Sequence, residues 1–188
     1  MPPIPRRAAL LMLLLPAACA SPNPVLYTLA TMPGPEVTVP RQRILMRSVN
    51  IARYLERPEI VRYSEDFQLD VRANAWWGEP LGPMIGRVLI EGLAQRAPNA
   101  SIFPENSGMS ANVDATLEIS IQRLDEDRRG LVQLRAQVVL IPQGSGTPRY
   151  RTIRLETTPE GTDLRAEVAA MSRALGLLAD AITQLLRG

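Results

Sequence analysis

The residue with the clearest covalent chemistry is Cys19, the only cysteine in the chain. It is preceded by a pair of arginines, an apolar run at 8–15 and two alanines. This order is typical of a secretory signal peptide, and the run is too short to cross a bilayer, which takes about 20 apolar residues. A cysteine at such a boundary predicts a thiol that is acylated after cleavage, so we expect a secreted lipoprotein held on a bilayer by its acyl chains.

Two features of this boundary leave alternatives open. Pro16 stands three residues before the cysteine, where bacterial lipoprotein signals usually carry leucine, and Ala18-Cys19-Ala20 also fits an ordinary signal-peptidase site without acylation. Ala20 is not the aspartate that keeps many enterobacterial lipoproteins in the inner membrane. The expected location is the periplasmic face of the outer membrane, with the inner membrane as the alternative.

The composition removes most other chemistry. All 21 basic residues are arginine, so there is no imidazole for acid–base catalysis or metal binding and no amine for a Schiff base. Without Arg6 and Arg7, 19 basic side chains face 19 acidic ones, and this balance argues against a nucleic-acid partner. Asp125-Glu126-Asp127 resembles a calcium loop only faintly, because Arg129 and Ala136 occupy ligand positions; a solvated turn is expected there. We predict no enzyme, no cofactor and no metal site.

Two segments could form recognition surfaces. Trp76 and Trp77 are adjacent, so on extended backbone they point in opposite directions and at most one is easily buried. The other could be an exposed contact of the kind enriched at interfaces, or both could pack around a helix start. Tyr54, Leu55 and Arg57 precede a proline, in a loop that either packs on the domain or docks a partner.

The elements that position these residues follow from the hydrophobic periodicity. Residues 1–18 are the expected signal peptide, 19–42 a lipidated tether with an edge strand at 25–29, and 43–188 one domain. Cys19 lies six positions before the start of that strand, a reach of about 20 Å. Alternation and 3.6-residue periodicity predict strands at 43–52, 59–63, 66–71, 113–122, 132–140 and 149–157, and helices at about 79–97 and 163–187.

These elements predict an α+β fold, in which a mostly antiparallel sheet packs against two helices in two layers. The last helix carries its apolar residues at steps of four and three, from Leu164 to Leu185. Such a stripe fits a helix laid across a sheet, which we favour, or a self-associating coiled coil.

Several segments resemble the ABC-type transport auxiliary lipoproteins, the PqiC-like family. The stretch from Tyr54 to Arg62, YLERPEIVR, is similar to the family's YLDRPQIVxR, and Trp77 to Leu81 is similar to its W-x-E-P-L. The family's lipidated cysteine and following Y-x-L strand resemble Cys19 and Tyr27 to Leu29, and its closing helix resembles 169–182. The departures are Glu56, Glu59 and Pro16, of which only Pro16 bears on acylation.

The resemblance implies a non-catalytic lipoprotein that works beside an MCE-domain transport system moving lipids between the two membranes and that supports envelope integrity. It also implies docking onto an MCE channel and its inner-membrane transporter, with several copies forming a ring. Two alternatives stay open at this point. One is a lipid carrier with an apolar cavity between sheet and helices, and the other is a lipoprotein that assists outer-membrane assembly.

Overall fold

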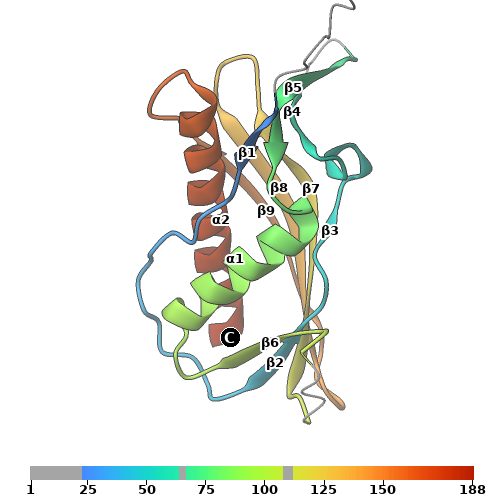
Figure 1. Ribbon diagram of the computed structural model, residues 1–188. Helices are drawn as coiled ribbons and strands as arrows, with labels where there is room; N and C mark the ends of the chain where they lie inside the picture. Colours follow the sequence, from blue (N-terminus) through green and yellow to red (C-terminus); the bar gives the residue numbers. More distant parts are fainter. Residues whose placement is uncertain (1–22, 64–66, 108–111) are drawn as a thin grey trace, which may run out of the picture.

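The computed structural model describes residues 23–63, 67–107 and 112–188 (Figure 1). Cys19 and the expected signal peptide lie outside the described residues. Three long strands form the centre of the larger sheet: β7 (Ala115–Glu126), β8 (Val132–Pro142) and β9 (Arg149–Thr157). They form an antiparallel meander in which Leu117 lies opposite Leu140. The predicted hairpin is confirmed, and its alternate apolar residues fill the core.

Short strands extend this meander into a six-stranded mixed sheet, β6-β2-β7-β8-β9, with β3 also on β7. β2 (Arg43–Met46) lies parallel to β7, and so does β3 (Asn50–Ile51). The prediction of one continuous strand at 43–52 was wrong, because exposed residues between β2 and β3 interrupt it. β6 (Ser101–Pro104) pairs with β2 and was not predicted, since four residues at an edge carry no clear alternation.

A second, three-stranded sheet has the order β1-β5-β4. β1 (Val25–Tyr27) runs parallel to β5 (Leu69–Trp77), and β4 (Glu59–Tyr63) is antiparallel to it. The strand predicted at 66–71 in fact runs on to Trp77, so both tryptophans belong to it. The apolar face expected from Phe67 and Leu69 is not buried, because both side chains are exposed where the β4–β5 hairpin leaves the core.

Two helices complete the α+β fold, as predicted. α1 (Leu81–Arg96) follows Trp77 almost directly, and α2 (Leu164–Arg187) crosses it and packs on β8 and β9 (Figure 1). Asp163 caps α2 by accepting from the Ala166 N–H. The α2 stripe from Val168 to Leu185 is buried inside this chain, which supports the helix-on-sheet interpretation over the coiled coil.

The segment after β1 lies on the two helices. Leu29 and Val39 are buried, the Ala30 N–H donates to Ser172 Oγ, and the Val37 N–H donates to the Arg96 carbonyl. Arg96, itself 1 % exposed, binds Asp180 with Nε and donates through Nη1 to the Met32 carbonyl. The described residues after β1, which were expected to lie in a tether over 19–42, therefore pack on the domain.

The charged segment at 125–130 also differs from its prediction as a solvated turn. Asp125 is 0 % and Asp127 4 % exposed. Asp125 accepts from Tyr54 and Arg123, and Asp127 accepts from the backbone N–H groups of Arg129 and Leu131. These carboxylates are structural acceptors that hold the β7–β8 turn and the loop after β3 in place. Among the described residues, no group of acidic side chains could hold a metal ion.

Candidate docking groove

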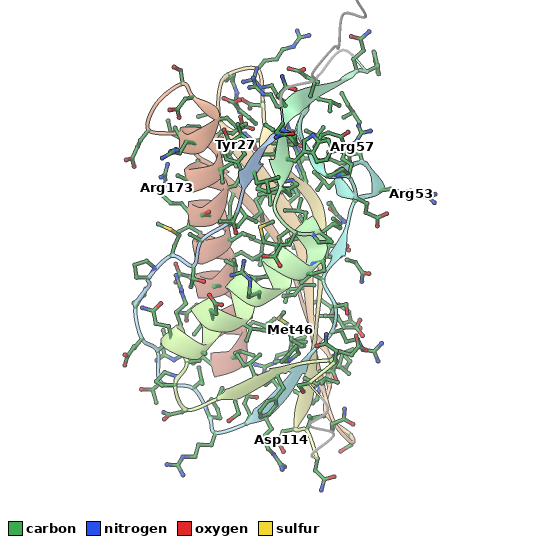
Figure 2. All side chains as sticks on the ribbon, viewed as in Figure 1. Tyr27, Met46, Arg53, Arg57, Asp114 and Arg173 are labelled. Carbon is green, nitrogen blue, oxygen red and sulfur yellow. The ribbon has the colours of Figure 1, made fainter. Side chains whose placement is uncertain are left out.

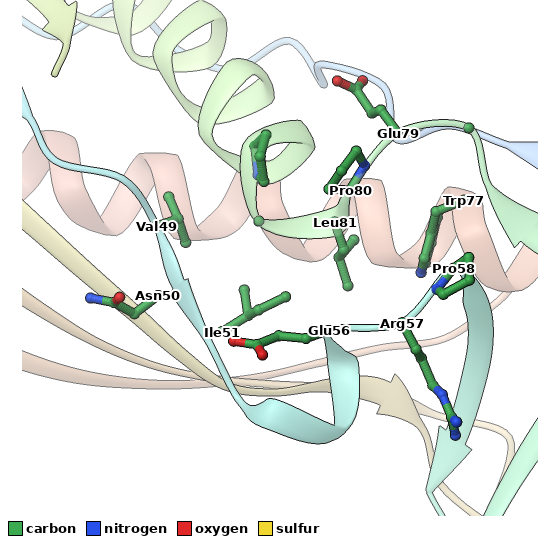
Figure 3. A pocket seen from close by; sticks show the side chains of 13 residues that line it. Val49, Asn50, Ile51, Glu56, Arg57, Pro58, Trp77, Glu79, Pro80 and Leu81 are labelled. Atoms are coloured by element: carbon green, nitrogen blue, oxygen red, sulfur yellow. The ribbon is translucent and has the colours of Figure 1, made fainter. Parts of the chain in front are cut away.

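An open groove lies between the start of α1 and the segment from β2 to β4 (Figure 3). It consists of two adjoining hollows of 540 and 410 Å³, which share Val49, Gly82 and Pro83. The first hollow is lined by Ile51, 56–58 and 77–83, and the second by 46–49 and one side of α1 as far as Glu91. The groove thus brings both sequence-predicted contact segments to one surface.

Backbone hydrogen bonds join these two segments at the end of the first hollow. The Trp77 N–H donates to the Pro58 carbonyl at 2.7 Å, and the Gly78 N–H donates to the Tyr27 carbonyl at 2.8 Å. Tyr27 and Arg57 accordingly lie towards the same end of the molecule, whereas Asp114 marks the other end (Figure 2). The three family-like segments that start at Tyr27, Tyr54 and Trp77 therefore meet in space.

Small residues on α1 let the β2–β3 segment approach the helix closely. A Cβ on Gly82 would lie 3.2 Å from the Val49 carbonyl oxygen, which is tighter than an ordinary contact. A Cβ on Gly86, one turn later, would meet the methyl groups of Met46 and Val49 at 3.8 Å. Gly86 and Ile90 remain partly exposed, so the floor of the second hollow is apolar and accessible.

Ion pairs neutralise most charges around the rim. Arg87 binds Glu79 at 2.6 Å and Glu91 at 3.7 Å, and Arg57 lies 3.4 Å from Glu59. The hydrogen bond to Glu79 raises the pKa of the Arg87 guanidinium group above its ordinary value. The groove therefore offers an apolar floor with a charge-balanced rim, which is typical of a protein contact surface.

Tyr54 and Leu55 position the groove wall. Leu55 is 3 % exposed, and the Tyr54 hydroxyl donates to Asp125 Oδ2 at 2.5 Å, which fixes the loop to β7. Burial, followed by this hydrogen bond, raises the pKa of Tyr54. Burial also raises the pKa of Asp125, against the opposite effect of its hydrogen bonds from Tyr54 and Arg123. For these two residues the packing interpretation is the one the geometry supports.

The other predicted contacts divide between two surfaces. Arg57 is exposed on the groove wall, and Trp77 is 7 % exposed behind Leu81. Trp76 faces away from the groove, pairs in register with Leu26 and donates from Nε1 to the Ala73 carbonyl. Sequence reasoning missed Val49, Gly86 and Ile90. Two glycines four residues apart, away from the apolar stripe of α1, were a signal for a close approach or a groove.

The polar groups of the groove include the ion pairs of Arg87 and Arg57 on its rim. In the second hollow the Ser48 hydroxyl and backbone N–H both donate to Glu105 Oε2, at 3.3 and 3.2 Å. Within 23–63, 67–107 and 112–188, no helix is both long and apolar enough to cross a membrane.

Comparison with protein families decides the identity. The model of the family described as ABC-type transport auxiliary lipoprotein component matches residues 27–183. The chain belongs to this family. Family members are lipoproteins that serve ABC-type transport, so the protein is an auxiliary lipoprotein of a transporter. A search of curated proteins finds no match to this sequence.

Two solved structures share the fold. The first is described only as an uncharacterized protein; it is 18 % identical, with a TM-score of 0.74 over 87 % of this chain and 98 % of its own. The second is a protein of the DUF330 family from Xanthomonas campestris. It is 19 % identical, with a TM-score of 0.70 over 87 % of this chain and 93 % of its own. At these identities the likeness concerns the fold alone.

Proposed function

We propose that this auxiliary lipoprotein is a non-catalytic component of an MCE-type system that transports lipid between membranes. Cys19 is its acylated anchor on the periplasmic face of the outer membrane, and the groove receives a periplasmic part of the transporter. The observation that carries the proposal is the convergence of the three family-like segments around one exposed groove. Several copies in a ring would present several such grooves.

A docking role explains why these segments lie where they do. Pro58, Gly78 and Pro80 hold the backbone of both walls, and the core side chains Leu55, Trp77 and Leu81 fix them from below. A preformed groove of this kind binds a partner without the entropy cost of ordering a loop first.

Filling the groove tests this role. Gly86→Leu places a side chain over the floor of the second hollow, and its Cβ makes only ordinary contacts. We expect the variant to fold and to reach the membrane, but to lose the MCE-domain protein when it is purified from solubilised membranes. Ala94→Leu is the matched control, because Ala94 is exposed on the same helix outside both hollows. Equal recovery of the MCE protein with both variants would contradict docking at the groove.

A lipid-carrier role would place the ligand between the sheet and the helices. In the described structure, buried side chains of α1, α2 and the large sheet pack there into one core, for example Leu89, Leu117 and Leu175. Docking is therefore the function that we favour. Phospholipid retained by the purified protein in native mass spectrometry, at one molecule per chain, would favour the carrier instead.

A further inference from the structure

Three arginines lie in one row across the large sheet. Arg123 of β7 lies directly opposite Arg135 of β8, and Arg135 lies directly opposite Arg154 of β9. Residues paired in this way project from the same face of the sheet, with Cβ atoms about 5 Å apart, and like charges in such positions destabilise a sheet. The stability of the sheet therefore does not explain this arginine row.

The arginine row lies on the face of the large sheet that the helices leave open. Leu134 and Ala136, on either side of Arg135, are buried in the core that the sheet shares with α1 and α2. Side chains alternate between the two faces along a strand, so Arg135 projects from the opposite face. Arg135 and Arg154 are both exposed. Their two guanidinium groups are therefore accessible from solvent at the same place.

The acidic side chains nearest to the arginine row are bound to other groups. Asp125 binds Arg123 at 2.7 Å. Glu156, two residues along β9 on the same face, lies 3.3 Å from Arg129. The other two arginines of the row have no ion-pair partner among the described side chains. Strands β8 and β9 together contain four arginines and one glutamate, so the excess of positive charge is local.

Protection of a sheet edge accounts for only part of the arginine row. β9 is the outermost strand, and charged side chains on an edge strand discourage pairing with another chain. Arg154 serves this purpose, but Arg123 and Arg135 lie on the interior strands β7 and β8. Neighbouring guanidinium groups suit the recognition of an anion, because each one forms paired hydrogen bonds with phosphate oxygens.

We propose that the arginine row binds the phosphate group of a phosphate ester, with Arg135 and Arg154 as direct contacts and the less exposed Arg123 at one end. Gln137 and Thr152 lie opposite one another on the same face, next to the two exposed arginines, and add a neutral amide and a hydroxyl donor. The bound phosphate replaces the repulsion between the arginines with a shared attraction. A lipid head group and a soluble phosphate ester both offer this chemistry. The site lies outside the groove and does not depend on docking there.

Side-chain NMR of the full chain in neutral detergent micelles tests the site. Nitrogen-15 labelling of arginine gives a separate Nε–H signal for each side chain, and single substitutions to glutamine identify those of Arg135 and Arg154. One titration adds glycerol 3-phosphate, which is a soluble ester. A second adds phosphatidylglycerol to the micelles, with zwitterionic phosphatidylcholine as the reference. The double variant Arg135→Gln/Arg154→Gln removes the exposed pair, and Arg41→Gln/Arg165→Gln is the matched control, because it removes the same charge at two exposed arginines elsewhere.

We expect saturable shifts of the signals of Arg135 and Arg154. In the double variant, the signal of Arg123 should need at least about tenfold more ligand to shift, whereas the control variant should behave like the wild type. A response to phosphatidylglycerol alone supports the proposal and assigns the site to a lipid head group, and a response to glycerol 3-phosphate supports it and assigns the site to a soluble ester.

Three results would overturn the proposal. One is the absence of a saturable shift in both titrations, which is also the result expected if the arginine row binds an acidic segment of a protein. Another is an equal shift with phosphatidylcholine and phosphatidylglycerol, without a response to glycerol 3-phosphate. The third is an unchanged affinity in the double variant.

Discussion

Glu167 gives the sharpest energetic prediction. It lies in the first turn of α2 and is 3 % exposed. Burial is the largest influence on this carboxyl group and the charge of Glu126 acts in the same direction, so that its pKa is raised from 4.5 to about 7 in spite of Arg72 and Arg62. The ionised carboxylate is therefore poorly accommodated in the folded protein, and the protonated form is favoured.

The sign and size of the effect follow from linkage. A carboxyl group whose pKa is raised by folding stabilises the protein fully below the unfolded pKa, and this contribution is lost as the pH rises through the folded pKa. A rise from 4.5 to about 7 corresponds to about 3 kcal/mol. Glu167→Gln replaces the titrating group with a neutral one of the same shape. The variant should therefore stay within about 1 kcal/mol of the wild type near pH 5 and exceed its free energy of unfolding by about 3 kcal/mol near pH 8.

Equilibrium unfolding in urea at the two pH values measures this difference. The quantity to compare is the change in unfolding free energy, variant minus wild type, because the other titrating groups then cancel. Glu160→Gln is the control, since Glu160 is 84 % exposed beside Arg173 and should show no such pH dependence. A Glu167→Gln variant that is less stable than the wild type at pH 8, by the same amount as at pH 5, would refute the reasoning. It would show that Glu167 is ionised and stabilised by Arg72.

Three further predictions concern the packing and the anchor. Gly34→Ala should lower the free energy of unfolding by about 1–3 kcal/mol, because a Cβ there would lie 2.2–2.5 Å from the buried guanidinium of Arg96; Gly86→Ala, with room for a Cβ, should not. Tyr54→Phe should lower the free energy of unfolding by about 1–3 kcal/mol, because it leaves the buried Asp125 without its hydroxyl donor. Tyr150→Phe is the control, since that side chain is 73 % exposed, and should leave the free energy of unfolding in urea unchanged. Cys19→Ala should move the protein from the membrane pellet to the soluble periplasmic fraction, and unchanged fractionation would exclude acylation.

Periodic sequence patterns predicted the long elements well. The last helix was expected at 163–187 and is observed at Leu164–Arg187, because its apolar residues repeat over many turns and Asp163 is a good cap. Strands β7 and β8 lie where apolar and polar residues alternate, at 113–122 and 132–140, so their inward faces were evident. In each case the signal is local and repeated.

Features that depend on distant contacts could not be predicted in this way. The prolines between 32 and 40 suggested a tether, yet Leu29 and Val39 are buried and Arg96 binds the carbonyl of Met32. Asp125 belonged to a charged run typical of a turn, but its partner Tyr54 is 71 positions away. A pattern of neighbouring residues cannot indicate a contact between two such distant positions.

The candidate site was predicted in part for the same reason. Arg57 and Trp77 were identified from their residue types and family-like spacing, and both line the groove. Val49 and Ile51, which also line it, come from a different segment, and the missing side chain of Gly82 allows this segment to lie close to α1. The groove is a product of this long-range approach, so only part of its lining was visible in the sequence.

Photo-crosslinking in living cells tests the central claim most directly. A benzophenone amino acid is placed at Arg57 on the groove wall, and in a second strain at Arg151, which is exposed on β9. We predict a crosslinked product between the acylated protein and an MCE-domain protein from position 57 and none from position 151. No MCE-domain product from either position, or the same product from both, would contradict docking of a transporter component at the groove.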